Sequence, residues 1–253
     1  MLQASILSGI PEIALYDPAI PFDSRNFRDI GNASTLSFNY DVEQRRLPNY
    51  RSAAGGTYAS ADRVNEVTGQ IDPRNFNPQN MALALWGSAT DVAGGVVADE
   101  AHVFHGAGTF VMTARMIDTT VAPVVEVGAT VVDTDDYVVE RAGIRFKDTV
   151  TTVGLAADAD ITISYTASSV VDIQALISSA PLVSVRLIGE DAVSGEPVTA
   201  RFYKVKLGLS SDVSLIGDDF GTLSLSMTME EDATIIGSGL SKYFKIQQLG
   251  VAA

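Results

Sequence analysis

Short runs of alternating apolar and polar residues recur along the chain, and they predict β-strands. The clearest run is Ala33–Glu43, where Leu36, Phe38, Tyr40 and Val42 alternate with polar or acidic residues. Successive side chains of a strand point to opposite faces. We therefore expect the apolar face of this strand to lie in the core and the polar face to lie in solvent.

A second predicted strand, Ala61–Asp72, follows, and we expect it to pair with the first. Its polar face includes Asp62 and Glu66, with Val64 between them in the alternation. Pairing would bring the acids of both strands onto one wet face. The predicted acidic patch consists of Asp41, Glu43, Asp62 and Glu66.

Residues Gln44–Ser60, between these strands, show no apolar period and contain a proline and a glycine pair. They predict a long loop, and loops beyond about 12 to 15 residues are usually functional or disordered. Two readings stay open, a mobile surface loop and an arm that contacts a partner. The candidate contact residues are Arg45, Arg46, Tyr50 and Arg51.

One helix is predicted over Asn77–Gly87. Asn77 suits the N-cap, proline follows at the first helical position, and Gly87 can end the helix. The spacing of its large apolar side chains favours packing on a sheet over binding a cofactor. Those side chains are Met81, Leu85 and Trp86.

The rest of the chain continues as short predicted strands without a recognisable linker, so the fold class is all-β with one helix. Leu182–Gly189 and Pro197–Leu207 form a predicted hairpin around an acidic turn. We expect a single domain over residues 1–253. Its parts would be an N-terminal arm at 1–29, the long loop at 44–60 and an extended β segment at 95–180.

The composition narrows the function classes. The chain has 253 residues, no cysteine and a formal net charge of −14, and 46% of its residues are hydrophobic. Cysteine-based metal sites, disulfides and cysteine nucleophiles are therefore excluded. A charge of one sign repels phosphate backbones, which argues against tight nucleic-acid binding.

Candidate chemistry is sparse. His102 and His105 follow two acids, but we expect histidines of a surface loop rather than a metal site. The clusters Asp133–Asp136 and Asp158–Asp160 are typical of solvated turns. No nucleophile elbow, phosphate-binding loop or complete dinucleotide fingerprint is present. We expect no cofactor, no metal and no enzymatic activity, although sequence alone leaves hydrolysis by a pair of carboxylates open.

Targeting signals give one further expectation. The first ten residues lack the basic region of a secretory signal, and the uncharged runs fall short of the ~20 residues of a membrane helix. We therefore expect a protein made and used in the cytoplasm, away from membranes.

Three local motifs resemble the major tail tube proteins of bacteriophages with long, non-contractile tails. The first is Asn80–Gly87, and the third is Leu215–Leu225. The second combines Val185–Asp191, Gly195–Val198 and Phe202–Val205. The likeness covers roughly Ile30 to Gln248, and residues 95–180 are the part that fits it least.

The resemblance implies a β-sandwich or partly open barrel flanked by one helix, in a subunit that forms hexameric rings. Stacked rings would make the tail tube of a virion assembled in the host cytoplasm, with the long loop reaching the next ring. Partners would be further copies and the tape-measure, tail-terminator and distal tail proteins. DNA would pass through an acidic lumen without specific binding. The alternatives are another virion protein, such as a head-decoration or collar component, and a carbohydrate-binding β-sandwich.

Overall fold

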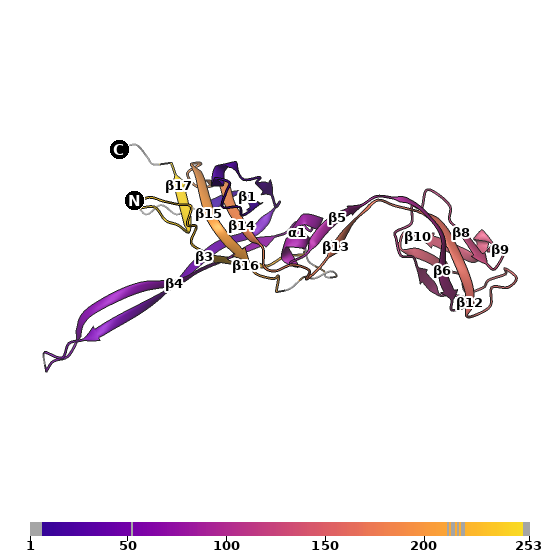
Figure 1. Ribbon diagram of the computed structural model, residues 1–253, viewed down its shortest axis with the longest axis horizontal. Helices are drawn as coiled ribbons and strands as arrows, with labels where there is room; N and C mark the ends of the chain where they lie inside the picture. The colour runs from indigo at the N-terminus through magenta and orange to yellow at the C-terminus, as the bar shows by residue number, and fades with distance from the viewer. Residues whose placement is uncertain are drawn as a thin grey trace. The chain divides into compact units, whose positions relative to one another are not determined.

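The computed structural model describes residues 7–51, 53–211, 213, 216, 218 and 221–249. Strands dominate this part of the chain, and its single α-helix is α1 (Pro78–Ala84) (Figure 1). The prediction of an all-β fold with one helix is confirmed. The chain divides into two compact units, however, where the sequence predicted a single domain. Unit 1 comprises residues 1–89 and 173–253, and unit 2 comprises residues 90–172.

Unit 1 is built on an antiparallel sheet with the strand order β2-β1-β14-β15-β16-β4-β3, in which β17 also pairs with β15. A short ribbon of β5 and β13 leads into and out of unit 2. The strands of the sheet are β1 (Leu7–Leu15), β2 (Arg28–Asp29), β3 (Ala33–Pro48), β4 (Thr57–Pro73), β14 (Leu182–Asp191), β15 (Pro197–Leu207), β16 (Leu225–Met229) and β17 (Phe244–Gln248). The strands of the ribbon, β5 (Ser88–Val92) and β13 (Val170–Gln174), cross the boundary between the units.

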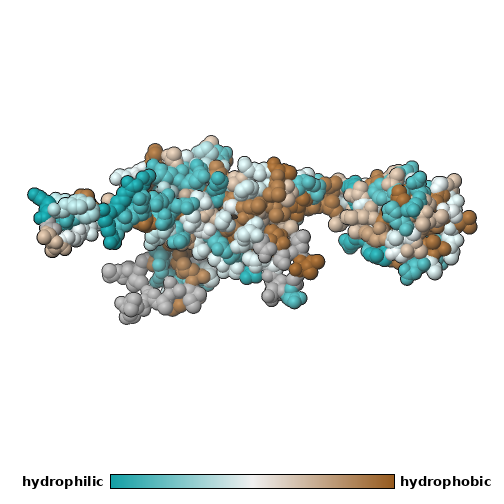
Figure 2. Space-filling view, turned by 90° about the horizontal axis from the view of Figure 1, so that it is seen from below, coloured by the Kyte–Doolittle hydropathy of each residue, from teal (hydrophilic) through white to brown (hydrophobic). Residues whose placement is uncertain are grey.

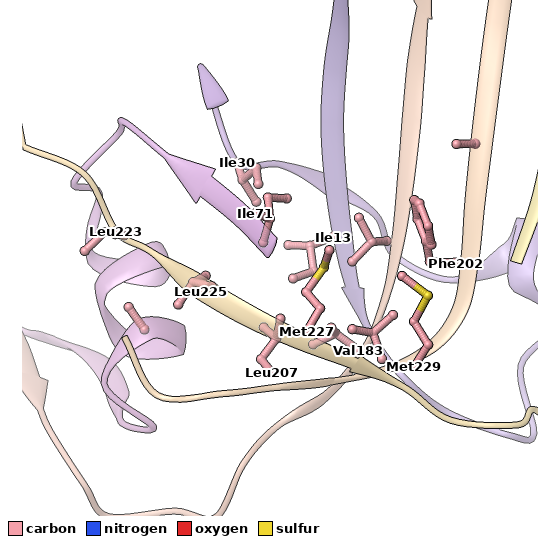
Figure 3. Packing of buried hydrophobic residues seen from close by; sticks show 14 of the residues in the cluster. Ile13, Ile30, Ile71, Val183, Phe202, Leu207, Leu223, Leu225, Met227 and Met229 are labelled. Carbon is pink, nitrogen blue, oxygen red and sulfur yellow. The ribbon is translucent and has the colours of Figure 1, made fainter. Parts of the chain in front are cut away.

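The core of unit 1 lies against this sheet. Buried apolar side chains from five strands pack there, and they include Ile71, Val183, Phe202 and Met227, each of which is at most 2% exposed (Figure 3). The hairpin predicted at Leu182–Gly189 and Pro197–Leu207 is confirmed as β14 and β15. Alternating apolar residues place one face of these strands in the core, as the pattern predicts.

The predicted N-terminal arm is wrong for the described part of residues 1–29. Strand β1 pairs with β14 along its whole length, from Leu7 opposite Asp191 to Leu15 opposite Val183. A one-turn 3-10 helix, η1 (Phe22–Ser24), follows and buries its phenylalanine. This segment carries apolar side chains that complete the core, so it belongs to the folded unit. Residues 1–6 lie outside the described residues.

Helix α1 forms where the sequence predicts it but ends earlier than expected. Asn77 is the N-cap, and its side chain accepts a hydrogen bond from the Asn80 amide at 2.8 Å. Met81 packs against the core of unit 1 as predicted. Leu85 is already the C-cap and Trp86 has a positive φ of 48°, so both lie beyond the last helical turn. The Trp86 indole nitrogen donates to the Leu207 carbonyl at 3.2 Å, which ties this turn to β15.

Unit 2 has its own core between two small antiparallel sheets, with the orders β6-β12-β8-β9 and β10-β11-β7. Phe104, Phe146 and Ile163 are among its fully buried side chains. This separate core explains why the chain forms two units without a linker signal. The elements are β6 (Gly95–Phe104), β7 (Phe110–Met112), β8 (Val124–Val127), β9 (Thr130–Val131), η2 (Thr134–Asp136), β10 (Tyr137–Glu140), β11 (Gly143–Phe146) and β12 (Ala159–Ala167).

Candidate functional site

The most exposed regular structure of unit 1 is the hairpin of β3 and β4, which extends beyond the rest of its sheet (Figure 1). The two strands pair from Ala33 and Pro73 to Pro48 and Thr57. The neighbouring strand β16 pairs with β4 only from Val67 to Ile71. Beyond Glu66, among the described strands, neither outer edge of the hairpin has a partner. We call residues 39–66 the projecting hairpin.

The long loop predicted at Gln44–Ser60 is wrong for most of its length. Strand β3 continues to Pro48 and β4 starts at Thr57, so only residues 49–56 connect them. The Asn49 amide donates to the Gly56 carbonyl at 2.8 Å, closing the turn. Both faces of this stretch are exposed, and strands exposed on both faces show no apolar period. The sequence pattern therefore did not reveal them. Ser52 lies outside the described residues.

The candidate contact residues are accordingly divided between strand and turn. Arg45 and Arg46 lie in β3, while Tyr50 and Arg51 lie in the turn, where Tyr50 is 83% exposed. The Arg45 guanidinium meets the Glu43 carboxylate at 3.1 Å in an exposed ion pair. Such a pair contributes little stability because solvent screens it. The arginines therefore lie at the far end of the ribbon, where, among the described residues, no strong local ion pair occupies them.

A β-bulge changes the predicted acidic patch. Asp41 lies opposite Glu66, and the next pair is Val42 opposite Val64, so Asn65 is the extra residue. An extra residue reverses the alternation, and it moves Asp62 to the face opposite to Glu66. The predicted patch of four acids on one face is therefore wrong in one member.

We call the face that keeps the other three acids the acidic face of the projecting hairpin. On it Asp41 faces Glu66, and Glu43 faces Arg63. The side-chain Nδ2 of Asn65 donates to the Asp41 carboxylate at 3.2 Å. Figure 2 shows a view in which the hairpin surface is mostly hydrophilic. Like charges directly opposite each other in a ribbon are unfavourable, so this face is not arranged for stability alone.

The other face carries a stripe of apolar side chains that the alternation assigned to the core. The exposed fractions are 39% for Phe38, 60% for Tyr40, 42% for Val42 and 52% for Val64. Only the start of the stripe is packed, where the Phe38 ring lies 4.8 Å from the Phe244 ring. The burial expected for Tyr40 and Val42 is wrong because no second layer reaches them among the described residues.

The histidines do not come together as a metal site. His102 lies in β6, not in a surface loop as expected, and its Nε2 lies 2.7 Å from Glu100 Oε1. His105 lies beyond the strand end and faces Asp158 at 3.3 Å. Over the described ranges, no group of three or more histidine and acidic side chains is placed to hold a metal ion.

The acidic cluster at Asp133–Asp136 forms a turn with one buried carboxylate. Asp133 caps η2 by accepting from the Asp135 amide at 2.9 Å, whereas Asp136 is 2% exposed. The amides and hydroxyls of Thr151 and Thr152 donate to Asp136 at 2.6–3.0 Å. These bonds, the Thr152 hydroxyl first among them, lower the pKa of Asp136 to about 2 against the opposing effect of burial. Sequence reasoning missed this interaction, because the threonines lie 15 or more residues away.

Comparison with known proteins places the chain in a family without assigning an activity. A family model described as "protein of unknown function UCP028589" matches residues 17–247. The chain belongs to this family. The match covers all of unit 2, the projecting hairpin and most of unit 1. No curated protein matches the sequence, and no described helix is long and apolar enough to cross a membrane.

Proposed function

We propose that this member of the family is the structural subunit of a bacteriophage tail tube, assembled as stacked hexameric rings that conduct DNA. The observation that carries the proposal is the projecting hairpin. A long ribbon with two unpaired edges and one apolar face is a template for association. The three motifs that resemble tail tube proteins support the same function, although Leu215 and several other residues of the third motif lie outside the described residues.

Association through the projecting hairpin satisfies its backbone groups and its apolar stripe together. A neighbouring copy that adds a strand at each edge pairs the free N–H and C=O groups. Repetition around a ring closes the sheet, and closure leaves no edge. The stripe of Phe38, Tyr40, Val42 and Val64 then packs against adjacent subunits. The arginines at the far end of the ribbon would contact acids of the next ring.

The acidic face would line the channel in this arrangement. Asp41, Glu43 and Glu66 outnumber the two arginines there, Arg45 and Arg63, and the whole chain carries a net charge of −14. Because carboxylates outnumber arginines on this face, few counterions would be released where DNA touches it, and DNA would be held only weakly at any point. The subunit acts without catalysis or a cofactor, in a virion whose tail-end and tape-measure proteins would be its other partners.

Electron microscopy of the concentrated protein tests the assembly. We expect stacked rings with sixfold symmetry and a central channel. A protein that stays monomeric at all concentrations and in infected-cell extract would contradict the proposal. Trimers or isolated rings would favour the alternative, a head-decoration or collar subunit, which also has an all-β fold.

The bulge at Asn65 supplies a matched pair of variants for the channel. Glu66→Lys places a cation on the acidic face, whereas Asp62→Lys places the same cation on the opposite face of the same strand. Each phosphate that such a lysine neutralises adds about −0.9 to the log–log salt slope of binding. We expect tails with Glu66→Lys to deliver DNA slowly, with relief at high salt, and Asp62→Lys to deliver normally. Equal delivery by both variants in intact tails would show that this face does not line the channel.

A further inference from the structure

Unit 1 contains a cavity of about 560 Å³ that no part of the proposed channel uses. It lies between the end of β1, the segment after it, and α1. Most of its wall is apolar, with Ile13, Ala82, Leu83 and Val183 among the lining residues. The charged lining residues are Asp17, Arg25 and Arg28.

The two arginines of this wall differ in how they are partnered. Arg25 donates to the Ile20, Tyr203 and Asp17 carbonyls and to Ser184, and its Nη2 lies 3.7 Å from Asp232 Oδ2. Its charge and hydrogen bonds are satisfied inside the unit. Arg25 is therefore a structural residue.

Arg28 is only partly satisfied. Its Nη1 donates to Asn80 Oδ1 at 2.7 Å, and Asn80 is held in turn by the Ile30 and Asn75 carbonyls. Its Nη2 is buried and has no hydrogen-bond acceptor within the described part of the chain. Burial takes water away from the Arg28 guanidinium and thereby lowers its pKa. Arg28 as a whole is half-buried, but a buried guanidinium nitrogen without an acceptor is costly and rare.

The chemistry of the cavity defines what would fill it. A guanidinium with one nitrogen already bonded and one free matches a carboxylate, which accepts charge-assisted hydrogen bonds. The apolar wall requires an apolar group beside that carboxylate. Leu15 and Ile20 also line the cavity and are 71% and 39% exposed, so part of this lining faces solvent. The carboxylate of Asp17 accepts from the Ala19 amide at 2.8 Å.

We propose that this cavity receives an acidic side chain and its apolar neighbour from a second copy of the chain, which pairs with Arg28. The proposal rests on the proposed self-assembly and names one of its contacts. The net charge of −14 ensures that a second copy brings many carboxylates. One surface that combines an acidic side chain with an apolar neighbour is formed by Glu190 and Ile188, because both are exposed on the same face of β14.

The position of that surface also suits a ring. Val183 lines the cavity at one end of β14, while Ile188 and Glu190 lie toward the other end. A contact between different surfaces of two identical subunits is head-to-tail, and such contacts close into rings when the rotation allows.

Chemical crosslinking tests the proposal directly. Arg28→Lys keeps the positive charge and adds an amine that a carbodiimide joins to a touching carboxylate, with loss of water. Assemblies made from mixed ¹⁴N and ¹⁵N subunits distinguish crosslinks between chains from those within one chain. We expect an interchain crosslink from the introduced lysine to an aspartate or glutamate, absent from the wild-type protein. Crosslinks only within one chain, for example to Asp17, or no crosslink in intact assemblies, would overturn the proposal.

An assembly measurement gives a second, independent result. Arg28→Gln removes the charge, and Arg141→Gln is the control, because Arg141 is exposed in unit 2. We expect Arg28→Gln to raise the protein concentration needed for assembly about tenfold or more, while the control changes it less than about twofold. Unchanged assembly of Arg28→Gln would overturn this inference but would not contradict the proposed tail-tube function. A wild-type protein that forms no tube would contradict the proposed function and this contact together.

Discussion

Asp136 should be the main determinant of the stability of unit 2 at acidic pH. Its buried carboxylate accepts four hydrogen bonds from Thr151 and Thr152, which hold the segment after β11 against η2. Asp136→Asn keeps the size of the side chain but replaces one acceptor oxygen with a donor group. The new NH₂ group then faces the threonine donors, so we expect the free energy of unfolding of unit 2 to fall by about 2 to 4 kcal/mol.

The pH dependence follows from the shifted pKa. The pKa of Asp136 falls from 3.8 to about 2 in the folded protein. A lowered pKa contributes stability that is fully present above the unfolded value of 3.8 and is lost as the pH falls through about 2. At about 1.4 kcal/mol per pKa unit, this contribution is about 2 kcal/mol. The stability difference between wild type and Asp136→Asn should therefore shrink as the pH falls from 5 toward 2.

Two probes separate the units in this experiment. Scanning calorimetry with amide hydrogen exchange over residues 90–172 reports unit 2, and the fluorescence of the single tryptophan, Trp86, reports unit 1. A loss of 2 kcal/mol should lower the melting temperature of unit 2 by about 10 °C and leave the Trp86 transition unchanged. Asp135→Asn is the control, because Asp135 is exposed in the same turn. Equal melting of the two variants would refute the structural reasoning.

Three further predictions concern the fold. Asn77→Ala removes the N-cap of α1 and should cost about 1 kcal/mol, measured by denaturant unfolding followed through tryptophan fluorescence; an unchanged midpoint would contradict the capping role. Gly143→Ala should destabilise unit 2 by about 2 kcal/mol or more, because φ is 153° and the new Cβ would meet the Val111 carbonyl at 2.1 Å, and calorimetry that finds wild-type stability would disprove this. Asp232→Asn should cost unit 1 about 3 kcal/mol by leaving the buried Arg25 charge without its ion pair, and thermal melts at pH 7 provide the measurement.

The projecting hairpin shows which structural features the alternation of residues predicts and which it does not. The alternation in Ala33–Glu43 correctly predicts a strand and its pairing with Ala61–Asp72. Alternation does not reveal what covers each face, and the apolar face is buried only where neighbouring strands continue alongside. The bulge at Asn65 was equally hidden, because it depends on cross-strand register. That single residue decides that Asp62 leaves the acidic face.

Other differences between the sequence-based expectations and the structure also arise because tertiary contacts leave no local sequence pattern. Arg45 and Arg46 lie in a strand exposed on both faces, where no core selects an apolar period. Residues 90–172 form a separate unit without a Gly- or Pro-rich linker, because the β5–β13 ribbon connects it through paired strands. Partners distant in sequence, such as Asp136 with Thr152 and Arg28 with Asn80, leave no local pattern at all.

The sequence by itself determined the β class, the position of the capped helix, the β14–β15 hairpin and the acidic character of the chain. These properties depend on side-chain alternation, capping residues and charge, all of which are local or additive. The tertiary structure decided the two units, the projecting hairpin, the face on which each acid lies, and the cavity with its unsatisfied arginine. Those features depend on register and on which surfaces find a covering layer, and only the folded chain brings such surfaces together.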